Sequence, residues 1–332
     1  MGSEPFPVCH VAEVEPIPPE RLWLIEELWL TQGVGVLGGA PKTCKTWIAA
    51  ELALAVASGG AAFGRYPVRD PGPVLFFGAE DSPQALRTRF EGVATQRGVA
   101  LGSVPLYLLD VAQLRLDRGE QVERLSATVA ARQPRLLVLD PFVRLARVDE
   151  NSAAEVSAVL GALRDLQRRH GVAILLVHHA RKASGGSPTQ AFRGSGDFGA
   201  WGDSNLHVAR RAGELVLRLE HRSAAAPEPL RLRLAAEATP HLELVTSEQS
   251  SGSSSPEGGL ELELLRLLGA TPRAHTTTEL RERVRRRKAD VVAALASLEA
   301  AGLALRTAQG WTRRQREGGA EEPGEQCSLF RP

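Results

Sequence analysis

The sequence predicts an α/β fold in which a mainly parallel sheet is flanked by helices. Short apolar runs alternate with helical segments between residues 34 and 179. The turn at residues 39–46 joins the first apolar run to the first helix. It fits the nucleotide-binding pattern G-x-x-x-x-G-K-[ST] except at Cys44, which replaces the last glycine. Polar residues follow several other apolar runs, at the strand ends where parallel sheets bind ligands.

The expected elements follow one another in a regular order. The pattern predicts strands at 34–37, 74–78, 106–109, 136–139 and 172–177, and helices at 46–57, 82–97, 120–132 and 153–170. Three later runs alternate apolar and polar residues, so we expect antiparallel strands added to the sheet at 206–209, 215–221 and 230–235.

Composition narrows the class of protein. A chain of 332 residues with a net charge of +1 is long enough for one sizeable core and an accessory domain. The cysteines are too few and too scattered for a disulfide framework or a metal site: Cys9, Cys44 and Cys327. No run approaches about 18 apolar residues, and no secretion signal is recognisable. We therefore expect a cytoplasmic protein with no membrane partner.

The loop at 39–46 has a clear physical purpose. Backbone N–H groups would wrap phosphates, and the next helix would present its positive end to them. Lys45 would reach the outer phosphates, and the Thr46 hydroxyl would hold Mg²⁺. An ordinary strand–turn–helix connection is the alternative. The residues expected to contact the nucleotide are Gly39, Ala40, Pro41, Lys42, Thr43, Cys44, Lys45, Thr46 and Trp47.

Two carboxylates follow predicted strands. Asp140 ends the run 136–139 and would hold Mg²⁺ directly or through water, although it could simply open an Asp-Pro turn. Glu80 ends the run 74–78 and would orient and deprotonate an attacking water. The alternative for Glu80 is a helix-capping pair with its neighbour Asp81. Asp81 and Ser82 can cap the next helix, and we expect Asp81 to be such a cap.

The run 172–177 ends in two histidines. Because side chains alternate along a strand, only one of them can face a nucleotide, and we prefer His179 over His178. Beyond them, residues 181–196 are rich in Gly, Ser, Pro and Thr and predict a mobile loop. Three basic residues flank this loop: Arg181, Lys182 and Arg193. They are either ordinary surface charges, or one of the arginines stabilises transition-state charge in a neighbouring subunit. We choose Arg193, because the Gly194-Ser195-Gly196 segment that follows it has a backbone able to fold over a phosphate.

Together these motifs resemble the RepA-like branch of the RecA-fold ATPases, to which plasmid replicative helicases of the RepA type belong. The resemblance spans about 22–235 and rests on Trp29, 33–47, 79–82, 139–141, 149–151, 178–182 and 193–195. It implies a RecA-like P-loop core that forms a ring, usually a hexamer, and hydrolyses ATP with Mg²⁺ at subunit interfaces. By motif the catalytic residues are Lys45, Glu80, Asp140, His179 and Arg193, and the metal-holding residues are Thr46 and Asp140. Cys44 departs from the plasmid helicases' glycine.

The remaining chain predicts a second domain. We expect an irregular leader at 1–20, the ATPase domain at 21–246, a flexible linker at 247–259, a winged-helix-like domain at 260–316 and a flexible tail at 317–332. Helix, helix-turn-helix and a β-wing near Gly310 follow in that order. Ten basic and three acidic side chains between 281 and 316 favour DNA as a partner. A small helical packing domain with a solvated charged face is the alternative.

The tail resembles the short bacterial sliding-clamp-binding peptide. A glutamine would fix the orientation of two adjacent apolar anchors, in a segment that includes Gln326, Ser328, Leu329 and Phe330. Chance similarity in a disordered tail is the alternative.

The whole pattern predicts a ring ATPase that acts on DNA in replication, repair or a mobile element. Two other functions remain open. One is an ATP-dependent DNA-binding regulator or adaptor that unwinds nothing, and the other is a degenerate nucleotide binder in which Cys44 abolishes turnover.

Overall fold

A computed structural model describes residues 6–150, 152–179, 197–211, 213–235, 239–245, 256–270, 273–284, 286–300, 302–307 and 309–313. Contacts divide the chain into two compact units, Met1–Thr246 and Ser247–Pro332. Each unit has its own hydrophobic core. None of the described helices combines the length and the apolar character that crossing a lipid bilayer requires.

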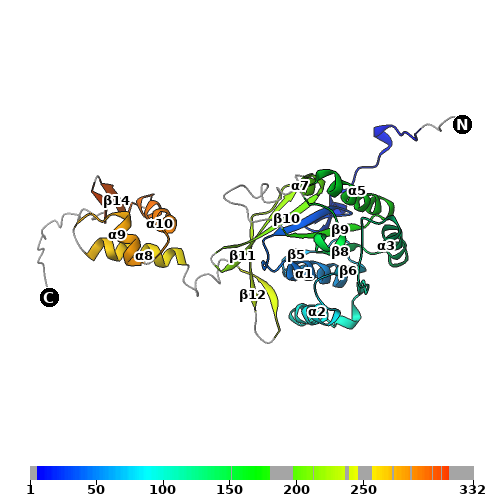
Figure 1. Cartoon of the computed structure of the whole chain (residues 1–332), viewed down its shortest axis with the longest axis horizontal. Helices are drawn as coiled ribbons and strands as arrows, with labels where there is room; N and C mark the ends of the chain where they lie inside the picture. Colours follow the sequence, from blue (N-terminus) through cyan, green and yellow to red (C-terminus); the bar gives the residue numbers. More distant parts are fainter. Residues whose placement is uncertain are drawn as a thin grey trace, which may run out of the picture. The chain divides into compact units, whose positions relative to one another are not determined.

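The first unit is built on a nine-stranded sheet with the order β13-β12-β11-β10-β3-β9-β8-β6-β7 (Figure 1). Neighbouring strands from β10 to β7 run parallel. Their bounds are β3 Val34–Gly39, β6 Val74–Gly78, β7 Leu106–Leu108, β8 Leu136–Asp140, β9 Ala173–His179 and β10 Ser204–Arg211. This confirms the mainly parallel sheet that the alternating runs predict.

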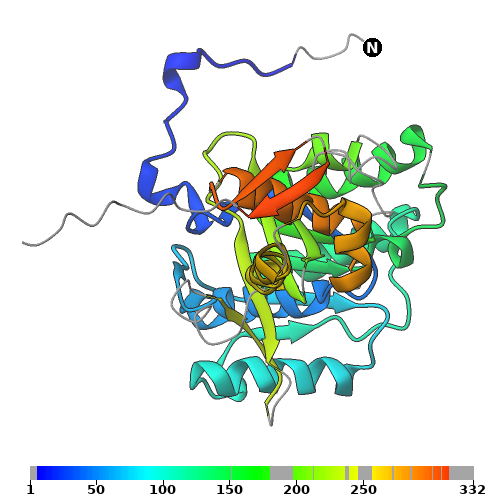
Figure 2. The ribbon, with the colours of Figure 1, turned by 90° about the vertical axis from the view of Figure 1, so that its left-hand side faces the viewer.

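Helices cover both faces of this sheet, because its strands are buried on both sides. The helices α1 (Lys45–Ser58) and α2 (Pro83–Arg97) lie on one side, with α2 packed against α1 (Figures 1 and 2). The other side carries α3 (Gly119–Arg132) and α5 (Ala153–His170). Alternate residues of each strand face the two cores: Val138 faces α1, whereas Leu137 and Leu139 face α5.

The far edge of the sheet differs from the expectation. β11 (Glu214–His221) and β12 (Leu230–Ala235) are antiparallel additions as expected, and β13 (His241–Leu244) extends them. The sequence pattern groups β10 with these antiparallel strands, but β10 pairs parallel with β3 on its other side. The alternating pattern of β10 arises because one of its faces is more exposed than the other. Such a pattern does not determine whether a strand pairs parallel or antiparallel. Short hairpins are formed by β1 (Trp23–Ile25) with β2 (Trp29–Leu30) and β4 (Ala61–Ala62) with β5 (Tyr66–Pro67).

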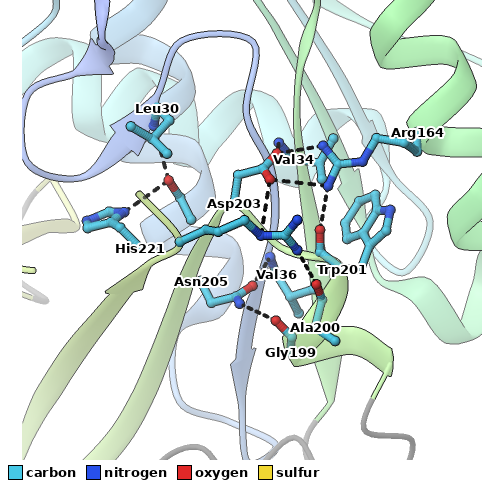
Figure 3. A network of polar contacts seen from close by, with 12 residues as sticks. Leu30, Val34, Val36, Arg164, Gly199, Ala200, Trp201, Asp203, Asn205 and His221 are labelled. Atoms are coloured by element: carbon cyan, nitrogen blue, oxygen red, sulfur yellow. Dashed lines mark hydrogen bonds and ion pairs between the residues drawn. The ribbon is translucent and has the colours of Figure 1, made fainter. Parts of the chain in front are cut away.

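A polar network fixes the short helix α7 (Asp197–Trp201) to the sheet (Figure 3). Asp203 accepts hydrogen bonds from the Val34 amide at 3.1 Å and from Arg164 at 2.6 Å, which ties the start of β3 to α5. The last carbonyls of α7, which lack partners inside the helix, instead accept side-chain hydrogen bonds. The donors are Asn205 to Gly199, Arg222 to Ala200 and Arg164 to Trp201.

The second unit consists of three helices and a two-stranded antiparallel sheet. The elements are α8 (Pro256–Ala270), α9 (Thr277–Val284), α10 (Lys288–Ala300), β14 (Ala304–Thr307) and β15 (Gly310–Arg313). Thr276 and Glu279 form a capping box at the start of α9, with hydrogen bonds of 3.2 and 2.9 Å. His275 adds a backbone bridge to Trp311 at the edge of the sheet.

Candidate functional site

The register of the parallel strands brings the predicted site residues to one edge of the sheet. Gly39, at the end of β3, pairs with His179 at the end of β9. Asp140, at the end of β8, pairs with Gly78 of β6, and the Asp140 carbonyl accepts a hydrogen bond of 2.7 Å from the Ala79 amide. Glu80 follows directly. Residues far apart in the sequence therefore meet at the carboxyl edge, where such sheets bind ligands.

The loop between β3 and α1 is tightly folded. A Cβ atom on Gly39 would lie 2.5 Å from the Val208 carbonyl oxygen, so only glycine fits there without a shift. The Thr43 hydroxyl donates to the Ala40 carbonyl at 2.8 Å. The Lys45 ammonium donates to the carbonyls of Gly39 and Ala40, at 3.0 and 2.9 Å. Burial lowers the pKa of Lys45, and the charges of Asp140 and Glu80 raise it.

Cys44 occupies the motif position that is normally glycine, and its backbone conformation shows why glycine is favoured there. Its φ is 59° and its ψ is 29°, a left-handed conformation just before α1. That conformation costs a residue with a Cβ about 1–2 kcal/mol, and glycine is free of that cost. Lys42, with φ of 64°, adopts a similar conformation. Burial raises the pKa of the Cys44 thiol, and the nearby Arg210, whose Nη2 lies 3.8 Å from the sulfur, lowers it.

Asp140 is the buried carboxylate of the site. Its residue is 6% exposed, and burial raises the pKa of its carboxyl to about 6, although the Thr46 hydroxyl donates a hydrogen bond that lowers it. Among the described residues no group of three or more His, Cys, Asp or Glu side chains could hold a metal ion alone. Two oxygen ligands and phosphate oxygens are nevertheless the set that Mg²⁺ takes in phosphate-binding sites. Thr46 and Asp140 therefore fit that ion.

Glu80 is the exposed carboxylate of the site. Its side chain is 42% exposed and lies between two basic groups. The Arg144 Nε donates to Oε1 at 3.1 Å, and the His179 Nε2 lies 3.6 Å from Oε2. The expectation that Asp81 caps the next helix is wrong. Ser82 is the cap and accepts from the Ala85 amide at 3.2 Å, because Asp81 is held by a two-pronged ion pair with Arg89.

The two histidines point to opposite sides, as alternation requires. His178 is 5% exposed, and its ring stacks on Phe198 with centroids 4.2 Å apart. Burial lowers the pKa of His178 to about 4, so it is neutral near pH 7. His179 is half-buried beside Glu80, and burial also lowers its pKa.

Comparison with known proteins adds a family to this geometry. Residues 3–185, more than half of the chain, match the family model described as an AAA domain. The chain belongs to the AAA domain family. No curated protein matches the sequence closely enough to be counted as a relative.

Solved structures show which fold this AAA domain chain has. It matches one structure described as an ATPase domain with a TM-score of 0.51 and 11% identity, over 65% of this chain and 86% of that one. A DnaB-like replicative helicase, solved to study its interactions with primase, gives a TM-score of 0.49 and 13% identity, over 65% of this chain and 57% of that one. The first likeness supports the α/β fold with a mainly parallel sheet.

Some predicted residues lie outside the described part of this AAA domain protein. They are Arg181, Lys182 and Arg193 after β9, Arg285, Arg314 and Arg316 in the second unit, and Gln326, Ser328, Leu329 and Phe330 in the tail. Conversely, sequence reasoning missed two described residues at the site. Arg144 reaches Glu80 from 64 positions away, and Arg210 reaches Cys44 from 166 positions away. Arg144 could have been suspected only from its place four residues after Asp140.

Proposed function

We propose that this protein is a RecA-type ring ATPase of the RepA-like kind that acts on DNA. The observation that carries the proposal is the meeting of Lys45, Asp140, Glu80 and His179 at one edge of the parallel sheet. A phosphate loop, a buried carboxylate with a neighbouring hydroxyl, and a second carboxylate open to water are the parts that phosphoryl transfer to water needs.

Each residue has a role in the proposed hydrolysis of ATP. The loop residues from Gly39 to Trp47 cradle the phosphates, and Lys45 leaves its carbonyl partners to contact the outer ones. Thr46 and Asp140 hold Mg²⁺, which when bound neutralises charge on the phosphate oxygens. Glu80 accepts a proton from water while the water oxygen bonds to the γ-phosphorus and the bond to the bridging oxygen breaks. His179, between Glu80 and the loop, senses the γ-phosphate.

Assembly and DNA binding belong to the same proposal. In a homo-oligomeric ring, most simply a hexamer, Arg193 of one subunit stabilises the transition-state charge in the next. The second unit acts as a winged helix. Its three helices, the two-stranded wing and the His275–Trp311 bridge support this, and exposed basic residues lead into α10: Arg283, Arg286, Arg287 and Lys288. The tail residues Gln326 to Phe330 bind a sliding clamp, which clamp pull-down before and after their deletion tests.

The decisive experiment measures ATP hydrolysis with and without single-stranded DNA, together with the mass in solution. Lys45→Ala should reduce turnover by roughly a hundredfold or more, because the charged donor to the phosphates is lost. The exposed Arg124 on α3 provides a matched control, since Arg124→Ala removes a charge far from the loop. A monomeric mass without DNA stimulation contradicts the ring motor.

The alternative is an ATP-dependent DNA-binding regulator or adaptor without unwinding activity. The separate basic unit favours it, since DNA binding there needs no motor. Strand displacement separates the two functions: a motor displaces a strand in an ATP-dependent manner, and a regulator does not.

A further inference from the structure

A polar cavity of about 530 Å³ lies beside Glu80, outside the phosphate loop. It is bordered by the end of β6, by the segment that follows β7, and by the short helix α4 (Phe142–Leu145) with the residues after it. Its charged lining residues are Arg115, Arg144, Arg147 and Glu80. Three arginines and one carboxylate therefore line the cavity, and this excess of positive charge favours an anion.

The three arginines differ in how they are held. Arg115 is only 11% exposed and is fixed by Asp117 through hydrogen bonds of 3.0 and 2.7 Å. Arg147 is exposed, and its guanidinium has no ion-pair or hydrogen-bond partner among the residues that the structure describes. Arg144 is shared, because it lines the cavity and also donates to Glu80. An anion that enters the cavity thus meets one free guanidinium and competes for another.

This cavity is separate from the phosphate loop. The phosphate loop follows β3, whereas the cavity borders β6 and the segment after β7, on the other side of β9 and β8 in the sheet order. The cavity therefore shares Glu80 with the expected nucleotide site, but none of its lining residues belongs to the phosphate loop. Guanidinium groups bind phosphate through paired hydrogen bonds, so a phosphodiester is the anion that suits this lining.

We propose that this cavity binds a phosphodiester of single-stranded DNA, and that Arg144 links its occupancy to the freedom of Glu80. The inference rests on the proposed function, since it concerns the base of that reaction. Without DNA, Arg144 occupies a carboxylate oxygen of Glu80 that would otherwise accept a proton from water. The Arg144 side chain is 60% exposed, and exposed ion pairs are weak, so a phosphodiester can draw the guanidinium away. Arg144 acts here as a positioning residue.

The test measures ATP hydrolysis by the full chain alone, with an oligothymidylate, and with sulfate at matched ionic strength. Oligothymidylate should stimulate the wild type more strongly than sulfate, a free anion of similar shape, because a free anion is held by this cavity alone. Arg144→Gln should raise the DNA-free rate by about tenfold and leave little further response to DNA, because Glu80 is free from the start. A merely structural role of Arg144 cannot produce this gain in rate.

Three further variants sharpen the test. Arg147→Gln should raise the oligothymidylate concentration for half-maximal stimulation by about tenfold, because the partnerless guanidinium is lost. Arg144→Lys keeps a cation that can pair with Glu80 and should rescue the DNA dependence. Arg124→Gln on α3 removes an exposed charge elsewhere and should behave as the wild type.

The outcomes separate this inference from the proposed function. A wild type that hydrolyses no ATP overturns both. Hydrolysis that DNA never stimulates overturns the inference and leaves the ATPase standing. A stimulated wild type with an Arg144→Gln variant whose DNA-free rate is at or below the wild-type value overturns the inference alone. Equal stimulation by sulfate overturns the assignment to DNA.

Discussion

The candidate site has two halves that are built differently. On the phosphate side, Lys45 and Asp140 are 5% and 6% exposed, and the loop backbone holds the Lys45 ammonium in place. On the water side, the Glu80 side chain is 42% exposed and is held only by Arg144 and His179 among the described residues. Both halves lie at the same sheet edge, so strand register alone does not create the difference.

The difference shows which part of the site is fixed by the fold. In the nucleotide-free protein, buried charges keep one arrangement because their few partners are set by packing, whereas exposed pairs exchange partners at little cost. The phosphate side should therefore respond to substitution through stability and pH as well as activity. The water side should respond through turnover alone, and the following predictions test this contrast.

The largest effect is expected on the water side. Glu80→Gln keeps the size of the side chain but removes the base, so kcat should fall by roughly 10²–10⁴-fold while nucleotide affinity changes little. Because Glu80 is exposed, the free energy of unfolding should stay within about 0.5 kcal/mol of the wild type. Steady-state hydrolysis and urea unfolding measure the two quantities. A large loss of stability would show that Glu80 belongs with the buried half.

Asp140→Asn should affect both stability and turnover. Burial raises the pKa of Asp140 from 3.8 to about 6, so the folded protein binds the proton more tightly than the unfolded chain does. The unfolding free energy of the nucleotide-free wild type should therefore fall by at most about 3 kcal/mol as pH rises through this window. Asp140→Asn should lose this dependence and, without the ligand for Mg²⁺, most of the activity. Urea unfolding from pH 4 to 7 tests it, with the exposed Asp110→Asn as control.

The sequence predicts the residues that form the site better than it predicts the side chains that hold them. Apolar runs end where strands end, so the placing of Asp140 and His179 at one edge follows from pattern and strand alternation. The direction of β10 was not predictable, because a strand with one exposed face pairs equally well in either sense. Arg144 and Arg210 were missed because their partners, Glu80 and Cys44, lie in segments that follow other strands, and only the folded sheet shows which surface arginine meets them.

Substitution of the two histidines should give a change in kcat of intermediate size, and it also compares a buried with a more exposed residue. His179→Ala should lower kcat about tenfold, because the imidazole that lies 3.6 Å from Glu80 and is proposed to sense the γ-phosphate is lost. His178→Phe should leave turnover within about twofold of the wild type, since Phe can keep the stack on Phe198 and His178 is already neutral at pH 7. Single-turnover hydrolysis measures both. Equal losses in the two variants would place His178 in the reaction as well.

The smallest effect is expected at Cys44, which stands where the phosphate-loop motif has its last glycine. Cys44→Gly should raise the free energy of unfolding by about 0.5–1 kcal/mol, because relief of the left-handed strain exceeds the extra entropy of glycine in the unfolded chain. With the Cβ gone, the backbone can approach the phosphates more closely, so KM for ATP should fall about two- to threefold. Cys44→Ser keeps a Cβ at the same φ and should resemble the wild type in both measurements. If Cys44→Ser instead matches Cys44→Gly, the thiol and its contact with Arg210, rather than the backbone conformation, determine the stability of the loop and its KM for ATP.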